Sequence, residues 1–488
     1  MATRLREQVV IIGSGAGGAV TAHELAASGL SVVVLEEGGR FELGDYGKSP
    51  PAAMQLLYRR RGMTPILGPV PIGFVEGCCV GGSTEINSGF WHRTPPEVLH
   101  HWKQHFAMEH VEPEDLAPHF EWAEQRLEVA NWSRELPKST KLMARGADLM
   151  GWSADIVPRA AARCENTNAC AQGCPKGAKQ GMSRNLIPQA EVRGARVIPN
   201  CTAKLLLIDG TKVTGVIAEI HLGEGRHELV RIDADHVFVC AGATQTPALL
   251  RRSGIKRNVG DTFLIHPMLK MAALFDEEVD AHSNVLPLVR VKEFLPDIAL
   301  GGAFYSPGHL ALMLSDNWRE NAARMPDFRR MAAYYVGVKS SGRGRVRPSW
   351  LDEGGATLKY EIAEDDLLNL SVGFARLAGL LLTAGAREVY PCVRGLPAIR
   401  SMEEANRWLG EKLPARALSL TTVHAFSSCP IGGRPDRCAA DQFGRVHGLA
   451  NLFVNDASML PDSPGVNPQG TIMALARRNA HHFTKVRT

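Results

Sequence analysis

The chain lacks the features that would direct it to a membrane or to nucleic acid. Its formal net charge is only +4 over 488 residues, and no run of lysine and arginine forms a basic patch. No uncharged apolar stretch approaches the ~20 residues that a membrane span needs. Met1 to Gln8 is short, polar and charged and leads straight into an apolar run, so no secretory signal fits. We therefore expect a cytoplasmic protein with no transmembrane segment and no nucleic-acid partner, whose substrate is a small molecule.

The chain has ample apolar sequence for a large core, because 45% of its residues are hydrophobic and 22% are charged. Apolar runs at 9–12 and 31–35 flank a helical segment at 19–28, which predicts a βαβ unit. The other expected elements are buried strands at 197–198, 204–208, 213–220 and 236–240, a helical region at 97–152, strand-like runs at 270–347 and a long helix at 365–384.

These patterns predict an α/β fold, α+β overall, with a discontinuous Rossmann-type nucleotide-binding domain. A substrate domain that contains an antiparallel sheet and helices is interleaved with it. The predicted boundaries assign 1–96, 155–265 and 425–488 to the nucleotide-binding domain, and 97–154 and 266–424 to the substrate domain.

A glycine-rich turn, Gly13-Ser14-Gly15-Ala16-Gly17-Gly18, lies between the first strand and the first helix. Gly13 permits the tight turn, Gly15 and Ala16 bring the backbone to a pyrophosphate at the helix N-terminus, and Gly18 lets helix and strand pack closely. Glu36 ends the second strand, where a carboxylate can accept hydrogen bonds from a ribose. The turn predicts a dinucleotide site, which suits NAD and FAD equally.

Three further segments decide between these cofactors. They are 80–89 (VGGSTEINSG), 240–250 (CAGATQTPALL) and a C-terminal block that includes 444–458 and 464–468. In this order they resemble the glucose-methanol-choline (GMC) oxidoreductase family along nearly the whole chain. The resemblance implies FAD as the cofactor, contacted by Gly82, Ser83 and Asn87 and by Asp456, Ala457 and Asn467. Covalently flavinylated members carry histidine where this chain has Ile86, so we expect noncovalent FAD.

The same resemblance places two catalytic residues. His424 falls on the family's catalytic histidine and Asn467 on its partner. The chemistry agrees, because oxidation of an alcohol requires a base for the hydroxyl proton, and a neutral imidazole can accept it while an amide orients the oxygen. His266-Pro267 also fits a family segment, whereas 426–428 (FSS) departs from the family's usual turn.

Three cysteines, Cys164, Cys170 and Cys174, stand within eleven residues, and the last precedes a proline. The spacing is similar to the loop that holds a three-iron cluster in the catalytic subunits of bacterial FAD-dependent glucose dehydrogenases, which implies a [3Fe-4S] cluster. Zinc is less favoured because a closed zinc site needs four ligands. The alternative is a structural loop, since long-chain alcohol oxidases of the family carry similar cysteine-rich stretches.

The predicted function is FAD-dependent oxidation of an alcohol on a sugar, cyclitol or aminoglycoside-like substrate. Electrons would leave through the cluster to a redox protein or quinone. Alternatives are a sterol or long-chain alcohol oxidase that uses O2, which the C-terminal block resembles equally well, and a GMC-like lyase or decarboxylase. A purely electron-carrying role would leave His424 and Asn467 without a task. Aromatic residues that could line the substrate pocket are Trp318, Tyr334, Tyr335 and Trp350.

Overall fold

A largely parallel sheet forms around the first apolar run of the chain. The structure is a computed structural model that describes residues 3–339, 341–350 and 354–487. Strand β1 (Thr3–Ile12) lies between β2 (Val32–Leu35) and β11 (Arg226–Val239) and runs parallel to both. The sheet order is β8-β2-β1-β11-β10-β9, with β22 beside the end of β11. The other strands are β8 (Arg196–Ile198), β9 (Cys201–Asp209), β10 (Lys212–Gly223) and β22 (Leu452–Val454).

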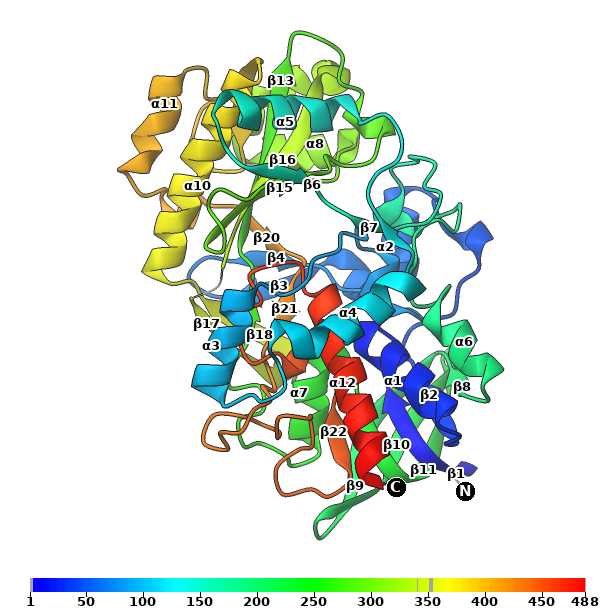
Figure 1. Ribbon diagram of the computed structural model, residues 1–488. Coiled ribbons are helices and arrows are strands. Elements are labelled where there is room, and N and C mark those ends of the chain that lie inside the picture. Colours follow the sequence, from blue (N-terminus) through cyan, green and yellow to red (C-terminus); the bar gives the residue numbers. More distant parts are fainter. Residues whose placement is uncertain (1–2, 340, 351–353, 488) are drawn as a thin grey trace.

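Helices cover this sheet, which is why the apolar residues of β1 from Val9 to Ile12 and all of β2 are buried. Helix α1 (Ala16–Ala27) packs against α12 (Gln469–Arg487) and α6 (Leu186–Val192). Helix α7 (Gly242–Arg252) follows β11. Figure 1 shows this part at the lower end of the molecule, with both chain termini.

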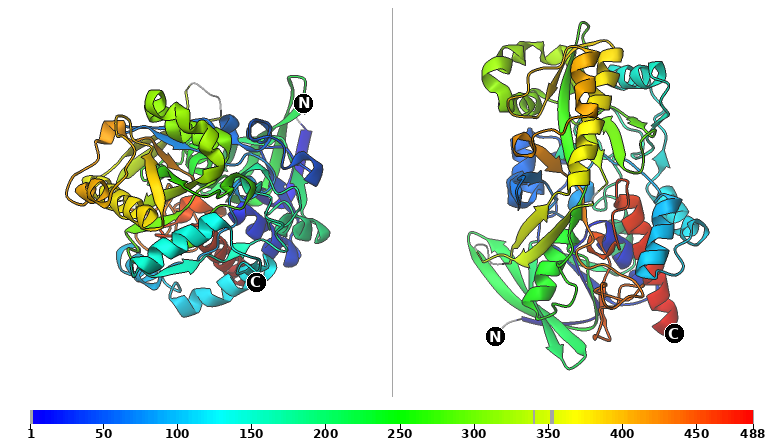
Figure 2. Two further views of the ribbon diagram at one scale, coloured as in Figure 1. Left: turned by 90° about the horizontal axis from the view of Figure 1, so that it is seen from above. Right: turned by 90° about the vertical axis from the view of Figure 1, so that its left-hand side faces the viewer.

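A second, larger and mostly antiparallel sheet forms the upper part of the molecule (Figures 1 and 2). Its order in the described residues is β17-β18-β3-β4-β20-β13-β16-β15-β14-β6, and β19 also pairs with β13. The strands are β3 (Thr64–Leu67), β4 (Ile72–Phe74), β6 (Ala154–Ile156), β13 (Met268–Phe275), β14 (Val289–Val291), β15 (Ile298–Gly302), β16 (Met331–Val338), β17 (Arg343–Pro348), β18 (Ala356–Glu361), β19 (Ala386–Pro391) and β20 (Leu420–Thr422).

One helix of the second sheet's layer is long and apolar enough, by length and composition, to cross a membrane. This helix, α10 (Glu364–Thr383), was expected as a long helix but not as a possible span. It packs against β16, β19 and α5 (Lys138–Leu149), and 67% of its apolar window is buried inside the protein. Gly385, just after it, has φ +95°, the left-handed conformation that ends many helices. The remaining helices are α2 (Pro50–Leu57), α8 (Pro307–Leu314), α9 (Trp318–Asn321) and α11 (Met402–Asn406).

Two segments lie outside the domain to which the sequence patterns assigned them. Strands β3 and β4 belong to the second sheet, although 1–96 was predicted as nucleotide-binding domain. Helices α3 (Pro96–Phe106) and α4 (Pro113–Arg126) were predicted in the substrate domain, but their apolar residues share one core with the first sheet, and α4 packs on α12. Helical periodicity shows which face of a helix is buried but not which sheet covers it, so it could not settle this assignment.

A two-stranded ladder joins the two parts. Strand β12 (Leu264–Ile265) pairs with β21 (Ala425–Phe426), and Ile265 lies opposite Ala425. His266 directly follows β12 and His424 directly precedes β21. The ladder therefore brings these two histidines together although 158 positions separate them. A second short ladder joins β5 (Val129–Ala130) to β7 (Arg159–Ala160).

Candidate functional site

In the glycine turn after β1, the backbone is open at Gly15, whereas Gly13 and Gly18 are packed so closely that no side chain would fit. A Cβ on Gly13 would lie 2.2 Å from the Cys240 carbonyl oxygen, and one on Gly18 would lie 2.0 Å from the Gly13 oxygen. A Cβ on Gly15 would meet nothing within 4 Å. The amides of the first turn of α1 have no partner within the helix and are available to an anion. These features fit the pyrophosphate of a dinucleotide such as FAD.

The loop at 81–89 lies against this turn, and its contacts with the cofactor stay a prediction. The Gly81 amide donates to Ser14 Oγ at 2.9 Å, and a Cβ on Gly82 would lie 3.0 Å from the Gly15 Cα. Ser83 Oγ accepts a bond from the Gly77 amide. The side-chain amide of Asn87 donates to Gln469 at the start of α12, so this side chain joins the loop to the C-terminal helix.

Two buried carboxylates, Glu36 and Asp456, hold the loops of the cradle in place. Glu36 accepts bonds from the amide and hydroxyl of Ser14 and from the Gly38 amide. Asp456 accepts bonds from the Gly242 amide, the Thr246 hydroxyl, and the amide and hydroxyl of Ser458, at 2.5–2.7 Å. Burial raises the pKa of both carboxyls, and these hydrogen bonds act in the opposite direction. The Asp456 side chain therefore joins the start of α7 to the turn at 456–458, and the contacts of Asp456 and Ala457 with FAD stay predictions.

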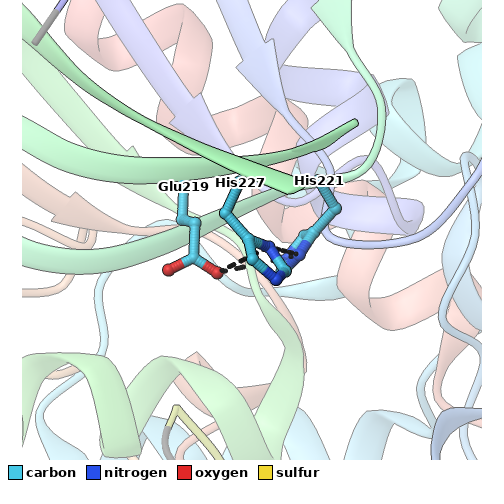
Figure 3. A group of neighbouring side chains, drawn as sticks. All are labelled: Glu219, His221 and His227. Carbon is cyan, nitrogen blue, oxygen red and sulfur yellow. Dashed lines mark hydrogen bonds and ion pairs between the residues drawn. The ribbon is translucent and has the colours of Figure 1, made fainter. Parts of the chain in front are cut away.

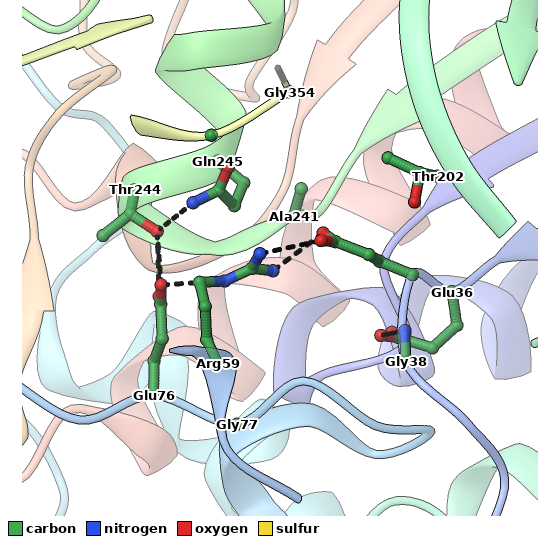
Figure 4. A network of polar contacts seen from close by, with 12 residues as sticks. Glu36, Gly38, Arg59, Glu76, Gly77, Thr202, Ala241, Thr244, Gln245 and Gly354 are labelled. Carbon is green, nitrogen blue, oxygen red and sulfur yellow. Dashed lines mark hydrogen bonds and ion pairs between the residues drawn. The ribbon is translucent and has the colours of Figure 1, made fainter. Parts of the chain in front are cut away.

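Beside Glu36, a buried arginine that sequence reasoning missed organises a further polar network (Figure 4). Arg59 donates two bonds to Glu37, at 2.8 and 2.9 Å, and its Nε lies 3.0 Å from Glu76. Thr244 on α7 donates to the same Glu76 carboxylate. A cavity of about 250 Å3 is lined by Glu37, Arg59, Cys78 and Gln245 among others, so it borders the carboxyl end of β2. No motif singled out Arg59.

The predicted catalytic pair lies at the junction of the two parts, within a chain of polar contacts. His424 Nε2 lies 3.3 Å from Asn467 Nδ2, and His424 Nδ1 lies 3.0 Å from His266 Nδ1. His266 Nε2 lies 2.9 Å from Ser463 Oγ. At the other end, Asn467 is hydrogen-bonded to His92. His92 Nδ1 lies 3.1 Å from Nη1 of Arg290.

The direction of hydrogen bonding in this network follows from Arg290, because a guanidinium can only donate hydrogen bonds. Arg290 donates to His92 Nδ1, so His92 carries its proton on Nε2, and His92 is also hydrogen-bonded to the Asn467 side chain. The Asn467 amide nitrogen then faces His424 Nε2 as a donor. His424 therefore has a bare Nε2 and carries its proton on Nδ1, which donates to His266; these proton positions are assigned from the network. The tautomer leaves Nε2 as the basic atom.

Burial keeps these imidazoles neutral. It lowers the pKa of His424 to about 4, and the charge of Arg290 acts in the same direction. It likewise lowers the pKa of His92 to about 3, again with help from Arg290, although the bond to Asn467 opposes this shift. Burial, His424 and Arg290 lower the pKa of His266. At neutral pH His424 is thus a neutral base of low intrinsic strength.

The three predicted cluster ligands lie around one narrow cavity. Cys164, Cys170 and Cys174 line it together with Arg159 and Lys179, and the cavity volume is about 10 Å3, which is the space of roughly one water molecule. Arg159 donates to the Cys170 sulfur at 3.1 Å and to the Cys164 sulfur at 3.7 Å. All ten cysteines of the chain are free thiols. The donor set suits an iron–sulfur cluster.

The same loop is tied to the cofactor loop. Arg159 also donates two bonds to the Ser88 carbonyl, at 2.8 and 3.0 Å. Buried Lys179 donates to the carbonyls of Glu85, Asn87 and Cys170. Arg159 therefore bridges two of the thiols to the 81–89 loop, and Lys179 bridges the Cys170 backbone to it.

Some aromatic residues that the sequence predicted in the substrate pocket lie elsewhere, and three residues at the site were not predicted. The Tyr334 ring is in the core, and its hydroxyl donates to the Ser139 carbonyl, so it lines no substrate pocket. Trp350 is 86% exposed and Trp318 is 48% exposed. The missed residues are His92, Arg290 and Ser463, and none of them stands in a motif that could have revealed it.

Comparison with known proteins agrees with this geometry. Two family models, both described as GMC oxidoreductase, match residues 9–268 and 340–476. An uncharacterised GMC-type oxidoreductase of Sinorhizobium fredii, y4nJ, is 38% identical over 98% of this chain and 94% of its own. The long-chain-alcohol oxidase FAO3 of Arabidopsis thaliana is 26% identical over 97% of this chain and 67% of its own.

Solved structures share the fold. Pyridoxine 4-oxidase from Mesorbium loti superposes with a TM-score of 0.73 at 17% identity, over 98% of this chain and 99% of its own. Formate oxidase of Aspergillus oryzae superposes with a TM-score of 0.74 at 15% identity, over 100% of this chain and 99% of its own. The α/β fold is that of these flavoenzymes. The chain belongs to the GMC oxidoreductase family, and it is an FAD-dependent alcohol oxidoreductase.

Proposed function

We propose that the protein oxidises a secondary or primary hydroxyl of a sugar, cyclitol or aminoglycoside-like substrate, with His424 as the base. The observation that carries this proposal is the directed chain from Arg290 to His266, which leaves Nε2 of His424 unprotonated and beside the Asn467 amide. A polar substrate is favoured because three imidazoles, an amide and a guanidinium meet there, and such groups bind hydroxyls rather than alkyl chains.

The chain's own residues divide the work as follows. His424 Nε2 accepts the hydroxyl proton while the carbon–oxygen bond becomes a carbonyl. Asn467 donates a hydrogen bond to the substrate oxygen and so holds the reacting carbon in one orientation. His266 accepts the proton of His424 Nδ1 and keeps the ring in the basic tautomer. When bound, FAD supplies the two-electron acceptor for the hydride that leaves the carbon. Gly13, Gly15, Ala16, Gly18, Glu36, Gly82, Ser83 and Asn87, with Asp456, Ala457 and Asn467, are the residues proposed to hold it.

An oxidase of long-chain alcohols is the second candidate, because relatives with that name match nearly the whole chain. The sugar-type dehydrogenase and the long-chain-alcohol oxidase differ in which alcohol reduces the flavin. The purified protein should be yellow and release FAD on denaturation. It should be bleached without oxygen by members of a polyol and sugar panel and not by decanol or a sterol. Bleaching by decanol alone would favour the oxidase. A flavin that no alcohol bleaches would favour a lyase or decarboxylase.

We propose further that Cys164, Cys170 and Cys174 are the residues that would hold a [3Fe-4S] cluster, which would supply a one-electron route to a redox protein or quinone in place of O2. Support comes from the three thiols around one cavity and from Arg159 and Lys179, whose charges offset the negative charge of a thiolate-bound cluster. Both cations also contact the 81–89 loop, which gives the cluster a short connection to the cofactor site. A cytoplasmic location, also proposed, would supply the reducing conditions that cluster assembly needs.

Iron analysis tests this part separately. Anaerobically purified protein should contain about three irons per chain and give an electron paramagnetic resonance signal when oxidised. Cys170→Ser should lose iron and keep FAD, whereas Cys201→Ser, which changes a buried thiol on β9, should keep both. Protein without iron, whose Cys170→Ser variant transfers electrons at the parent rate, would make the loop structural.

A further inference from the structure

Arg290 is a positive charge at one end of the catalytic cluster, and in the part of the chain that the structure describes it has no acidic partner. It lies on β14, at the interior of the second sheet, and is largely buried. Its register partner on β6 is Asp155, but the Asp155 carboxylate lies 2.5 Å from Lys292 instead. Among residues 3–339, 341–350 and 354–487, no carboxylate lies within 4.0 Å of the Arg290 guanidinium.

The contacts that Arg290 does make are with neutral groups. Nη1 donates to His92 Nδ1 at 3.1 Å, and Nη2 donates to the Gly465 carbonyl at 3.4 Å. A guanidinium carries five N–H groups, so several remain for a ligand. Asp462, close in sequence to Gly465, lies instead beside His101 and Arg343.

The surrounding groups leave this charge uncompensated. Burial and Arg290 lower the pKa values of His92, His266 and His424, so these rings are neutral and none of them can offset the charge of Arg290. Lys339 contributes further positive potential at His266. Burial also lowers the pKa of the Arg290 guanidinium, and Tyr335 and Asp155 oppose that shift. A buried cation of this kind is costly unless an anion joins it.

We propose that Arg290 binds a carboxylate of the substrate, so that the preferred alcohol is a sugar acid or another hydroxy acid. The inference rests on the proposed alcohol oxidation and narrows its substrate class. A guanidinium binds a carboxylate through two parallel N–H bonds, which would fix the anionic end of the substrate at β14. The path from Arg290 through His92 and Asn467 to His424 then places the reacting hydroxyl beside the base. The substrate's negative charge also offsets the positive potential that weakens His424 as a base.

The test compares matched acids and neutral sugars. Glucuronate and galacturonate are titrated against glucose and galactose, and glucose 6-phosphate serves as the phosphate arm. Two quantities are measured, the perturbation of the oxidised flavin spectrum on binding and the anaerobic rate of flavin reduction. Wild-type protein should bind the uronates at least about tenfold more tightly than the neutral sugars. Arg290→Gln should abolish that ratio, and Arg290→Lys should retain part of it. Arg343→Gln, at an exposed arginine, should leave it unchanged.

Several outcomes decide the matter. Equal binding of uronates and neutral sugars, an unchanged ratio in Arg290→Gln, or a preference for the phosphate ester alone would overturn the carboxylate site. An Arg290→Gln variant whose flavin reduction potential falls while the ratio stays the same would assign the charge to the cofactor instead. If uronates perturb the flavin through Arg290 but no alcohol reduces it, the anion site stands and alcohol oxidation falls.

An independent observation concerns the β10–β11 hairpin, which carries three potential metal ligands on one face (Figure 3). His221 and His227 are opposite each other across the hairpin, and their Nδ1 atoms are 2.8 Å apart. Glu219 Oε1 lies 3.4 Å from His227 Nδ1 and 3.7 Å from His221 Nδ1. Two ligand atoms of a tetrahedral zinc ion are separated by about 3.3 Å, given bonds of about 2.0 Å. The three atoms thus approximate one face of such a tetrahedron.

The neighbouring contacts suit metal binding. Thr202 Oγ1 lies 3.1 Å from His221 Nε2, so this nitrogen can donate to the hydroxyl and leave Nδ1 free for a metal. Lys204 contacts the other oxygen of Glu219, at 3.3 Å from Oε2, and leaves Oε1 directed at the imidazoles. We infer that Glu219, His221 and His227 bind a divalent transition metal such as Zn2+, with solvent as the fourth ligand.

Calorimetric titration of the FAD-loaded protein with Zn2+ tests this site. Wild-type protein should bind one Zn2+ per chain. His227→Gln should weaken this binding by at least about a hundredfold, while FAD content and melting temperature stay the same. Because thiols also bind zinc, Cys170→Ser serves as the control and should keep the site. Titrations that are identical in wild-type and His227→Gln protein, or a site lost only in Cys170→Ser, would overturn it.

Discussion

The cofactor cradle and the catalytic pocket of this protein are built in opposite ways. In the cradle, the turn at 13–18 and the loop at 81–89 present backbone, and the buried acids Glu36 and Asp456 accept three and four hydrogen bonds from the chain itself. In the pocket, side chains from distant elements converge, and the charge of Arg290 has no acidic partner in the described residues. A cradle whose loops are tied together by the chain's own bonds is rigid and fits one cofactor, whereas the free N–H groups of Arg290 leave bonding capacity for a substrate.

The largest effect should come from breaking the cradle at one of two glycines with opposite surroundings. Gly18→Ala places a methyl 2.0 Å from the Gly13 carbonyl oxygen, so it should displace α1 from β1 and yield little folded protein. Gly15→Ala meets nothing within 4 Å, so the apoprotein should fold normally but bind FAD at least about tenfold more weakly. Apoprotein melting temperature and FAD titration check both variants. An apoprotein of Gly15→Ala that unfolds as readily as Gly18→Ala would contradict the distinction.

In the pocket, His424→Ala should slow the reduction of bound flavin by alcohol about a hundredfold or more, the usual scale for a positioned base. FAD should remain bound, because the cradle does not depend on this side chain. Stopped-flow reduction measures the rate, and His100→Ala, at an exposed histidine of α3, serves as the control. Near-normal reduction in His424→Ala would remove the role assigned to it.

The glycine turn of the cradle could be predicted from the sequence, because each glycine permits either a tight turn or a close backbone approach. The spacing of the glycines alone indicates these roles. His424 and Asn467 could be predicted only through the family resemblance. Arg290, His92 and Ser463 could not be predicted, because their meeting depends on the β12–β21 ladder and on the register of β14. The reassigned strands β3 and β4 likewise depend on pairing with β18 and β20, partners that are remote in sequence.

The pH dependence of flavin reduction, which depends on the pocket, should differ from that of FAD binding, which depends on the cradle. Burial and Arg290 lower the pKa of His424 to about 4, so the neutral base persists well below the ordinary histidine range. The rate of flavin reduction should therefore fall only as the pH drops through about 4, while FAD binding follows a different profile. Arg290→Gln removes a cation and should move this acid limb to higher pH. A wild-type limb near 6.5 would contradict the electrostatic account of the pocket.

The smallest effect should come from Ser463, which touches neither base nor amide. Its hydroxyl lies 2.9 Å from His266 Nε2 and accepts that proton, so it acts on His424 through His266 as a positioning residue. Ser463→Ala leaves a buried N–H unsatisfied, at a cost of about 1–3 kcal/mol, which favours the opposite tautomer of His266. That tautomer carries a proton on Nδ1 and faces the Nδ1 proton of His424, so a fraction of His424 should switch to the nonbasic form. The rate should fall about three- to tenfold, and Ser463→Thr, which restores the hydroxyl, should recover it. A purely structural role would lower the melting temperature of Ser463→Ala without a rate loss that threonine reverses.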